Sequence, residues 1–409
     1  MKTITIKAET PIHGGLAIGR FDGRVVMIKC AIPGETVEAR VDTEKKDYWT
    51  ATAVRVIEPS PDRVEPRSVY FGECGGCQLQ HVSYARQVRM KEEILKNTLL
   101  RIGGIEASLS PPLTGSPWNY RRRGRFKASR GKMGFFREKS REVVDVEHCS
   151  LMTDAVNAHY AKARELLRDA DVKELQVSCG DDGCTALVMP YPGGMADRDD
   201  MAGALLDAGF SGVLAETKAE PLRYGKEYIT LDLIGLTFTV SPTSFFQSNW
   251  ELNNALVRLV IETLKPLAGR RVVDLYSGAG NFALPAAREG ALVTAVEENP
   301  SAVADGRRNI EINGLAGCDF VLSGADSFEM TGPVDVLIAD PPRTGLAPGA
   351  LDKMLALGPG RIVYVSCDPA TLSRDLKKLT AGYEIESVRL VDFFPQTYHV
   401  ESLTFLRLK

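Results

Sequence analysis

The first 57 residues alternate apolar and polar side chains in short runs, and glycine-rich or charged turns separate the runs. The runs are ITIKAE, GGLAIGRFDGRVVMI and GETVEARVDTEKKDYWTATAVRVI. Alternation with a period of two residues is typical of strands that bury one face. We therefore predict a small all-β, barrel-like domain over residues 1–58. Three prolines in the following EPSPDRVEPRS predict a linker over residues 59–68.

Residues 69–240 and residues 241–409 differ in their patterns. The first range mixes strand patterns with a helical pattern at YARQVRMKEEILKNTLLRIGG, which predicts a central α+β domain. Further on, the strand patterns RRVVDLY, ALVTAVE, DFVLSG, VDVLIAD and RIVYVS alternate with helical segments. That order predicts an α/β domain with a doubly wound, parallel sheet covered on both faces. The last two strands are joined by a segment too short for a crossover helix, so we expect them to be antiparallel.

The composition is that of an ordinary globular protein, with 44% apolar residues, 25% charged residues and a net charge of −3. Because the whole chain is not polycationic, any nucleic-acid site must be a local patch. No apolar run reaches the ~18 residues that span a bilayer, and MKTITIKAET lacks the apolar core of a signal peptide. We therefore expect a cytoplasmic protein with no membrane segment and no obligatory protein partner. In that compartment the eight cysteines are expected to be thiols or metal ligands rather than disulfides.

A glycine-containing loop follows the first strand of the predicted parallel sheet. In VVDLYSGAGNFA, Asp274 lies in the strand, and Gly278 and Gly280 allow a tight turn with close approach by a ligand. Glu297 ends the next strand, where a carboxylate can bind the two hydroxyls of a ribose. A second motif, ADPPRTG, places Asp340 after a later strand. Together the motifs predict a site for S-adenosylmethionine (SAM) rather than NAD, and a plain strand-to-helix turn is the alternative.

The run IVYVSCDPATLSRD places Cys367 at the end of a buried strand, where Asp-Pro stops the strand and a helix begins. Methylation of nitrogen or oxygen needs no thiol, because the lone pair of the target attacks the methyl group directly. Carbon-5 of uracil is a poor nucleophile until a thiolate adds to carbon-6, and a base must then remove the carbon-5 proton. Cys367 and Glu401, at the start of the last strand, supply that thiol and that base. The alternatives are a small buried cysteine and a solvated glutamate.

These motifs resemble, in order and over the whole chain, those of the RNA 5-methyluridine methyltransferase family. SCDPATLSRD resembles the family's nucleophile motif and FPQTYHVES its base motif, which implies those roles for Cys367 and Glu401. SFFQSN resembles the segment that supplies a cofactor-binding glutamine, Gln247, and makes Phe245 a candidate to stack on the target base. GGLAIGR and IPGE resemble the RNA-binding TRAM domain. The resemblance implies further SAM contacts for Tyr276, Asn281, Glu297, Asp326 and Asp340.

Two positions depart from the family's pattern. Asp368 stands where asparagine is common, and its charge is expected to raise the pKa of the neighbouring Cys367 thiol. The helix that begins after Pro369 is expected to lower that pKa. Ser277, in the SAM loop, stands where many members have cysteine. Neither departure removes a catalytic role.

A second group of cysteines has the spacing of a metal site: Cys74 and Cys77 in FGECGGCQLQH, and Cys149 in VDVEHCSLM. The family's four-iron cluster uses a further cysteine six residues before the first of these, where this chain has Ser68. A cluster with a ligand other than cysteine, a labile cluster and a relic site are all compatible with three thiolates. Zinc bound by the three cysteines and His81 or His148 is another alternative. Cys179 and Cys184 in VSCGDDGCT are predicted to belong to a hairpin.

The segment WNYRRRGRFKASRGKMGFFREKSRE (118–142) holds ten Lys or Arg residues against two Glu, with aromatic residues between them. Cations contact phosphates and aromatic rings stack on unpaired bases, so this tract is predicted to bind RNA. A charged, solvated hairpin is the alternative. The target uracil must leave any base stack to reach the thiol. The candidate RNA contacts are Arg121, Arg122, Arg123, Arg125 and, in ADPPRTG, Arg343.

The sequence therefore predicts a SAM-dependent enzyme that methylates carbon-5 of a uridine in structured RNA through a covalent bond between Cys367 and carbon-6. The N-terminal TRAM domain favours large-subunit ribosomal RNA as the substrate, with transfer RNA as the second choice. Two other function classes fit parts of the sequence. One is an RNA-binding protein or chaperone with an inactive methyltransferase site. The other is a nucleic-acid N-methyltransferase that uses DPPR and is indifferent to the loss of Cys367.

Overall fold

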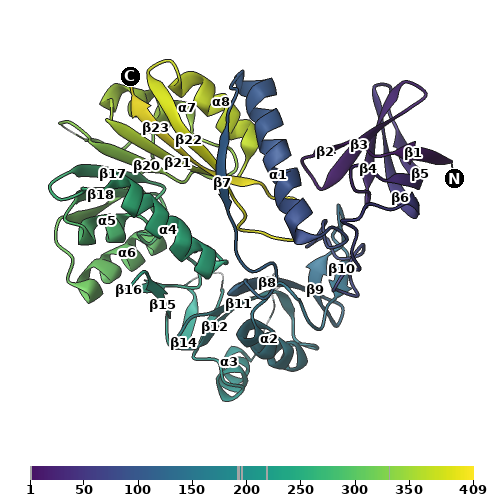
Figure 1. Cartoon of the computed structure of the whole chain (residues 1–409). Helices are drawn as coiled ribbons and strands as arrows, with labels where there is room; N and C mark the ends of the chain where they lie inside the picture. Colours follow the sequence, from purple (N-terminus) through teal and green to yellow (C-terminus); the bar gives the residue numbers. More distant parts are fainter. Residues whose placement is uncertain (1, 191–193, 195–196, 218–219, 331) are drawn as a thin grey trace.

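The structure, a computed structural model, describes residues 2–190, 194, 197–217, 220–330 and 332–409. Three parts, each with its own sheet and apolar core, make up the chain. Helix α1 (Tyr84–Thr98) lies between the first part and the last (Figure 1). No helix among the described residues is both long enough and apolar enough to cross a membrane.

The N-terminal part is a six-stranded sheet in the order β1-β5-β6-β4-β3-β2 around one small core. In β1, Ile4 and Ile6 are buried and the residues on either side of them are exposed, as the period of two predicts. The strand order and this alternation confirm the predicted all-β domain. Its strands are β1 (Thr3–Lys7), β2 (Thr10–Ile12), β3 (Leu16–Phe21), β4 (Arg24–Lys29), β5 (Thr36–Glu44) and β6 (Tyr48–Glu58).

The central part is a seven-stranded sheet in the order β10-β9-β8-β11-β12-β13-β14. Helices α2 (Asp154–Leu166) and α3 (Arg198–Asp207) cover one face and share an apolar core with it (Figure 1). This arrangement confirms the predicted α+β character of the region. The strands are β8 (Arg123–Ser129), β9 (Lys132–Phe136), β10 (Val143–Asp145), β11 (Val172–Cys179), β12 (Cys184–Pro190), β13 (Gly212–Ala215) and β14 (Leu222–Gly225).

Cys179 and Cys184 are directly paired residues of the β11–β12 hairpin, as predicted, and a disulfide bond joins them. The expectation that the cysteines are thiols or metal ligands is therefore wrong for this pair. The antiparallel register places the two side chains on the same face and opposite each other, which cysteine spacing alone does not reveal. The other six cysteines are free.

The C-terminal part is built on an eight-stranded sheet in the order β19-β18-β17-β20-β21-β23-β22-β7. Strands β17 to β21 are parallel, and β23 is antiparallel to both of its neighbours. This confirms the predicted doubly wound sheet and the antiparallel pairing of the last two strands. The strands are β7 (Leu109–Leu113), β17 (Arg271–Leu275), β18 (Leu292–Glu297), β19 (Cys318–Leu322), β20 (Val336–Ala339), β21 (Arg361–Ser366), β22 (Tyr383–Val391) and β23 (Glu401–Leu408).

Helices cover both faces of this sheet, because its central strands are apolar on both sides. One face packs against α4 (Trp250–Leu264), α5 (Ala283–Arg288) and α6 (Pro300–Asn313). The other face packs against α1, the short π-helix η1 (Leu99–Gly103), α7 (Pro348–Leu357) and α8 (Pro369–Leu379).

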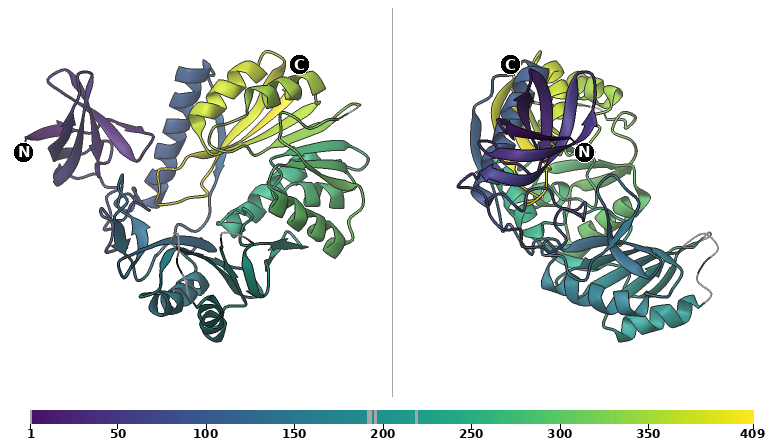
Figure 2. Two further views of the ribbon diagram at one scale, coloured as in Figure 1. Left: turned by 180° about the vertical axis from the view of Figure 1, so that it is seen from behind. Right: turned by 90° about the vertical axis from the view of Figure 1, so that its right-hand side faces the viewer.

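Two segments predicted to belong to the central domain (residues 69–240) pack with the C-terminal part instead. Strand β7 pairs with β22 at the edge of the C-terminal sheet, and α1 lies beside it in both views (Figures 1 and 2). The ribbon of β15 (Ile229–Leu233) and β16 (Leu236–Val240) shares its core with α4. Both segments therefore belong to the C-terminal part. The alternation of apolar and polar residues in a strand does not show which distant strand it pairs with.

Candidate active site

Four segments with candidate chemistry meet at one edge of the eight-stranded sheet. The parallel strands β17, β20 and β21 lie side by side, so their carboxyl ends share that edge. Residues 276–281 follow β17, residues 340–343 follow β20, and Cys367 follows β21. Because β23 is antiparallel to β21, it begins at the same edge with Glu401.

The predicted nucleophile and the predicted base stand opposite each other. The ladder between β21 and β23 ends with Ser366 paired to Ser402, so the next positions along the two strands are Cys367 and Glu401. The cysteine is partly buried and the glutamate is buried. The sheet register thus brings together two residues that lie 34 positions apart in the sequence.

The surroundings of Cys367 keep its thiol protonated in the free protein. Burial and the carboxyl groups of Glu401 and Asp340 raise the pKa of the thiol to about 12, and the Arg343 guanidinium acts in the opposite direction. Only the thiolate is a strong nucleophile, so the thiol must lose its proton as the reaction begins. Arg343 is the cation at this edge that favours the thiolate.

The helix that follows Cys367 begins with a negatively charged cap. The Asp368 carboxylate caps α8 by accepting the N–H groups of Ala370 and Thr371, each at 2.9 Å. This charge opposes the effect of the helix end on a neighbouring thiol. The pKa of the thiol is raised rather than lowered overall, because burial and the carboxyl groups of Glu401 and Asp340 dominate.

Glu401 is poised to exchange a proton near neutral pH. Burial raises the pKa of its carboxyl group to about 8, and the carboxyl groups of Asp340 and Asp392 add to the rise. Lys91 and Arg343 act in the opposite direction. A carboxyl group that titrates near the working pH can take up a proton in one step and release it in another.

Beside this pair, six of the predicted residues line one narrow cavity. The Gln247 side chain hydrogen-bonds the buried carboxyl group of Asp340, whose pKa is raised by burial to about 7. Asn281 exchanges two hydrogen bonds with Asn253 of α4, at 2.8 and 3.0 Å. The predicted residues that line the cavity are Phe245, Gln247, Tyr276, Gly278, Asn281 and Asp340.

The loop after β17 depends on its glycines for two different reasons. Gly278 and Gly280 both have positive φ angles, of 55° and 101°. A Cβ atom at Gly280 would lie 2.8 Å from Leu284, whereas one at Gly278 would meet open space. Glu297 holds the loop, since its carboxylate accepts the Gly278 N–H at 2.9 Å and the Asn299 N–H at 2.8 Å. Packing therefore requires Gly280, and Gly278 leaves room for a ligand.

Polar groups next to this loop fit a bound ligand that carries positive charge. The carboxylate of Asp274 and the hydroxyl of Ser277 are buried, and none of their oxygens makes a hydrogen bond of good geometry. Burial and the neighbouring Asp340 raise the pKa of Asp274 well above its ordinary value. Asp326, after β19, borders the same loop because its charge acts on the Tyr276 phenol. The cationic groups of SAM would offset these buried carboxylates.

Known proteins resemble the chain over its whole length. Family models match at three places: TRAM domain over residues 1–54, Methyltransferase small domain over residues 238–356, and tRNA (Uracil-5-)-methyltransferase over residues 333–409. The chain is 36% identical to the 23S rRNA (uracil(1939)-C(5))-methyltransferase RlmD of Thiobacillus denitrificans, with 96% of each chain covered. The chain belongs to the RNA uracil-5-methyltransferase family. It is also 33% identical to an uncharacterized RNA methyltransferase of Aquifex aeolicus, with 100% of this chain and 99% of that protein covered.

A solved structure shows the same architecture as this RNA uracil-5-methyltransferase. The tRNA (uracil-54, C5)-methyltransferase of Pyrococcus abyssi, in complex with S-adenosyl-L-homocysteine, superimposes with a TM-score of 0.79 and 26% identity. The match covers 98% of this chain and 99% of that one. SAM is therefore the methyl donor and RNA the substrate of this enzyme. The two rival function classes, an inactive RNA-binding protein and an N-methyltransferase, do not hold.

Two arginines predicted to contact RNA have partners inside this methyltransferase. The Arg121 guanidinium lies 5.0 Å from the centre of the Phe394 ring and lines the cavity that contains Cys74, Cys77 and Cys149. Arg123 donates to the carbonyl oxygens of Ser244 and Phe246, at 3.1 and 3.4 Å. Both side chains are partly buried, and their contact with RNA stays a prediction.

The other predicted RNA contacts have partners on the protein but remain accessible. Arg122 is paired with Asp181 at 2.6 Å, and Arg125 donates to Glu174 at 2.6 Å. Arg343 donates to the ring of His399, with nitrogen–nitrogen distances of 3.0 and 3.2 Å. Burial and Arg343 lower the pKa of His399 to about 3, so the ring is neutral and can accept. Phe245, 59% exposed beside the cofactor cavity, lies 5.2 Å from the Arg123 guanidinium.

The three cysteines of the predicted metal site line one cavity of about 110 Å³ in this enzyme, together with Ser68, His148 and Arg121. His81 does not line the cavity, so of the two histidines considered as zinc ligands only His148 is placed there. Within the described ranges, the one set of three ligand atoms within 4.8 Å of one another is His159 with the disulfide-bonded Cys179 and Cys184. The thiols of Cys74, Cys77 and Cys149 are therefore spaced more widely than one small ion requires.

The sequence offered no signal for several residues at the site. Lys91, Asp392 and His399 lie around Glu401 and Arg343, but they come from a distant helix and from an irregular loop. His13 of the TRAM domain packs edge-on against Tyr398, with ring centres 5.3 Å apart. The N-terminal domain therefore touches the loop that leads to Glu401.

Proposed function

We propose that this enzyme methylates carbon-5 of one uridine in 23S ribosomal RNA, in the cytoplasm. The observation that carries the chemistry is the position of Cys367 opposite Glu401 at the SAM-binding edge of the sheet. The observation that favours ribosomal RNA is full-length similarity, at 34–36% identity, to proteins named 23S rRNA (uracil(1939)-C(5))-methyltransferase RlmD. The solved structure with a transfer RNA target is less similar, at 26% identity.

In the proposed reaction, Cys367 acts on carbon-6 of the uracil and Glu401 acts on the proton of carbon-5. When bound, SAM supplies an electrophilic methyl group. The Cys367 thiol gives its proton to solvent, and the thiolate bonds to carbon-6 of the uracil. The electron pair of the carbon-5–carbon-6 double bond moves into an enolate with the carbon-4 carbonyl, which makes carbon-5 nucleophilic. After carbon-5 has gained the methyl group, Glu401 takes the proton from carbon-5. The electron pair of that C–H bond forms the carbon-5–carbon-6 double bond, and the bond between carbon-6 and sulfur breaks to return the thiolate.

The residues proposed to hold SAM are those around the loop after β17. Asp340 and Gln247, which are hydrogen-bonded to each other, face the cavity beside Cys367 and fix its polar end. Glu297 shapes the glycine loop and offers its carboxylate to the ribose hydroxyls. The remaining proposed SAM contacts are Tyr276, Gly278, Gly280, Asn281 and, on the adenine side, Asp326.

The proposed path of the RNA runs from the catalytic edge over the central domain. A cavity of about 680 Å³ separates the TRAM domain from the β8–β9 hairpin, and its lining includes His13, Arg125, Lys127 and Phe136. Phe136 is an exposed ring with the Lys127 ammonium 5.6 Å from its centre, which suits a stacked base and its phosphate. We assign Phe245 to the target base because its exposed ring stands beside the cofactor cavity.

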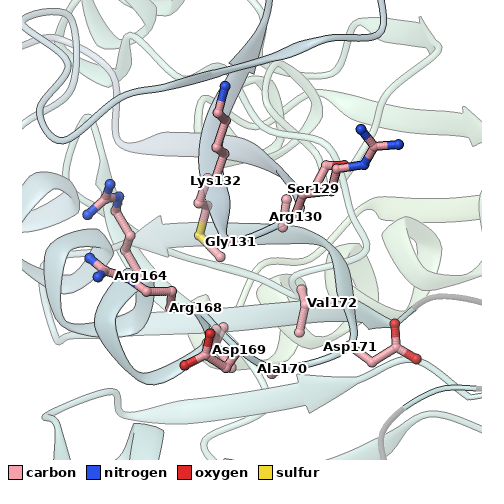
Figure 3. A pocket seen from close by; sticks show the side chains of 13 residues that line it. Ser129, Arg130, Gly131, Lys132, Arg164, Arg168, Asp169, Ala170, Asp171 and Val172 are labelled. Atoms are coloured by element: carbon pink, nitrogen blue, oxygen red, sulfur yellow. The ribbon is translucent and has the colours of Figure 1, made fainter.

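A second hollow, of about 370 Å³, lies at the tip of the β8–β9 hairpin and the end of α2. Figure 3 shows Arg130 and Lys132 extending from the tip, with Arg164 and Arg168 on the α2 side. Arg164 is paired with Asp145, and no ion pair of Arg130, Lys132 or Arg168 is found within the described residues. We assign these three cations to phosphates of the same RNA.

We also propose that Cys74, Cys77 and Cys149 hold an iron–sulfur cluster with Ser68 on its fourth side. Donors already face the sulfur atoms: the Gly76 N–H reaches Cys74 at 3.4 Å, and backbone N–H groups of Leu151 and Met152 reach Cys149. The Arg121 Nε atom is buried without a partner in the same cavity. N–H groups and a guanidinium stabilise an anionic cluster, which would tie the cysteine loop to the central domain.

The test of the substrate uses purified full-length protein, methyl-labelled SAM, and separate 23S ribosomal RNA and transfer RNA that lack 5-methyluridine. We expect nucleoside mass spectrometry to find 5-methyluridine in the 23S RNA only. Labelled 5-methyluridine in transfer RNA alone would overturn the target assignment, and no product in either RNA would overturn the reaction. Iron and sulfide analysis of anaerobically purified protein tests the cluster. A full content of zinc without sulfide would contradict it.

A further inference from the structure

Helix α1 buries two polar side chains on one face. Gln87 and Lys91, one helical turn apart, are 0% and 1% exposed, and the other buried residues of the helix are almost all apolar. An ammonium group is costly to bury unless it is paired and hydrogen-bonded. The partners of these two side chains therefore show what the helix is built to hold.

Lys91 binds the chain just before the catalytic glutamate. Its ammonium group donates to the Asp392 carboxylate at 2.7 Å and to the carbonyl oxygen of Phe394 at 2.9 Å. Asp392 is the first residue after β22, and the carboxyl group is itself buried. Residues 392–400, which connect β22 to Glu401 at the start of β23, are called the base loop below.

Gln87 fixes the middle of the base loop. It donates to the Gln396 side chain at 2.9 Å and accepts the Gln396 N–H at 2.9 Å. Gln396 is buried and has a φ angle of 69°, a left-handed conformation that a residue other than glycine adopts only when its surroundings impose it. Tyr120 adds a bond to the carbonyl oxygen of Pro395 at 2.9 Å.

Lys91 also belongs to the charged surroundings of Glu401. The groups that face this carboxyl come from four elements: Lys91 from α1, Asp392 from the end of β22, Asp340 and Arg343 from the loop after β20, and the Cys367 thiol from the end of β21. Two of them are cations and two are carboxyl groups. Lys91 is the buried one of the two cations and binds the start of the base loop at Asp392 and Phe394, whereas the exposed Arg343 contacts the ring of His399 near its end.

We propose that Lys91 is a positioning residue for the release of the methylated RNA, because it fixes the base loop that leads to Glu401. The proposal rests on the reaction given above. In the release step Glu401 takes the carbon-5 proton, the carbon-5–carbon-6 double bond forms, and the Cys367 sulfur leaves carbon-6. Lys91 touches none of these atoms. Without it, the covalent bond to the RNA forms but breaks slowly.

The test compares formation with release of the covalent complex in the double variant Lys91→Met/Asp392→Asn, which removes both buried charges together. The substrate is whichever RNA the wild-type enzyme methylates, so a wrong target leaves the comparison intact. The same RNA with 5-fluorouridine at the target measures formation alone, because its carbon-5 carries no proton for Glu401 to remove. Lys96→Met, an exposed position on the same helix, is the matched control.

We expect the double variant to form the trapped complex at the wild-type rate and to release methylated RNA about tenfold more slowly or worse. The covalent complex should accumulate on denaturing gels. A ratio of release to formation within about twofold of wild type would overturn the proposal. So would an equal fall in both rates.

A second variant keeps the test decisive if the double variant does not fold. Gln87→Met removes the anchor of Gln396 without touching a charge. We expect slower release with an unchanged pH profile, because the base loop is loosened and the charges around Glu401 stay. Release at the wild-type rate in this variant would overturn the role of the base-loop anchors.

Discussion

Two neighbouring regions of the enzyme bury charged groups and treat them in opposite ways. At the sheet edge, the carboxyl groups of Asp274, Asp340 and Glu401 lie close together. Burial raises the pKa of all three, and the Asp340 charge adds to the rise for Asp274 and Glu401. At the start of β8, the partly buried guanidinium of Arg123 donates to two backbone carbonyl oxygens and packs on two aromatic rings. The carboxyl groups at the sheet edge are poorly compensated, whereas the Arg123 guanidinium has hydrogen-bond partners.

The difference separates chemistry from structure. Poorly compensated buried carboxyl groups cost folding free energy, and they are found where a ligand or a reaction uses them. A buried cation with good partners contributes to the packing of the chain and has little left to offer a substrate. Substitutions in the two regions should therefore have opposite signatures: loss of activity with little loss of stability at the edge, and the reverse at β8.

The largest effect is expected for Cys367→Ala. Without the thiol, carbon-5 of the uracil is not activated, so the methylation rate should fall by roughly 10⁴-fold or more. The free energy of unfolding should stay within about 1 kcal/mol of wild type, because the thiol is only partly buried. Nucleoside mass spectrometry and urea unfolding measure the two quantities. Substantial residual 5-methyluridine would show that another nucleophile acts.

Glu401→Gln should stop the reaction at a later point. The amide cannot take the carbon-5 proton, so methyl transfer proceeds and release slows by about 10²- to 10⁴-fold. A covalent protein–RNA complex that carries the methyl group should accumulate on denaturing gels. Glu384→Gln, on the exposed surface of β22, is the matched control. A variant that turns over normally would place the base elsewhere.

The position of Cys367 opposite Glu401 is predictable from the sequence, because topology leaves little choice. Once the strands before Cys367 and after Glu401 are recognised, a doubly wound sheet must bring both residues to its ligand-binding edge. The positions of Lys91 and His13 near the site could not be predicted from the sequence. Lys91 comes from helix α1, which was predicted to belong to the central domain, and His13 comes from the TRAM domain. Neither position carries a local pattern that differs from an ordinary helix or turn.

The arginine run shows a second feature that the sequence does not reveal, which is the set of contacts that each side chain makes. Arg123 and Arg125 lie on the same face of β8, because they are two residues apart in the strand, so alternation does not separate them. Arg123 donates to the carbonyl oxygens of Ser244 and Phe246, whereas Arg125 stays exposed beside Glu174. Composition indicates the charge of the tract, but the contacts of Arg121 and Arg123 depend on Phe394 and Ser244, which lie more than a hundred residues away in sequence.

An intermediate effect, on stability rather than chemistry, is expected for Arg123→Met. The substitution leaves the carbonyl oxygens of Ser244 and Phe246 without their donor, so unfolding should become easier by about 1–3 kcal/mol. Arg122→Met, which loses a partly exposed pair with Asp181, should cost less than about 1 kcal/mol. Urea unfolding of the two variants side by side measures the difference. Equal free energies of unfolding for the two variants would contradict the structural role of Arg123.

A further effect on stability concerns its pH dependence. The pKa of Glu401 is about 8 in the folded protein and lies near 4.5 in the unfolded chain, so the folded state holds a proton that the unfolded state has lost. The stabilising contribution is complete below pH 4.5 and is lost as the pH rises through 8. Wild-type protein should therefore lose stability between pH 5.5 and pH 8.5, with Asp340 and Asp274 adding to the slope.

In Glu401→Gln the part of the slope that comes from this carboxyl group disappears. The difference in unfolding free energy between pH 5.5 and pH 8.5 should then shrink by about 3 kcal/mol, measured by urea unfolding at both pH values. Glu384→Gln should leave the slope unchanged, because that carboxylate is exposed. Identical slopes in wild type and Glu401→Gln would mean that Glu401 is already ionised in the free enzyme. The carboxylate would then be ready for the carbon-5 proton before RNA binds, and the buried charge at the sheet edge would be compensated after all.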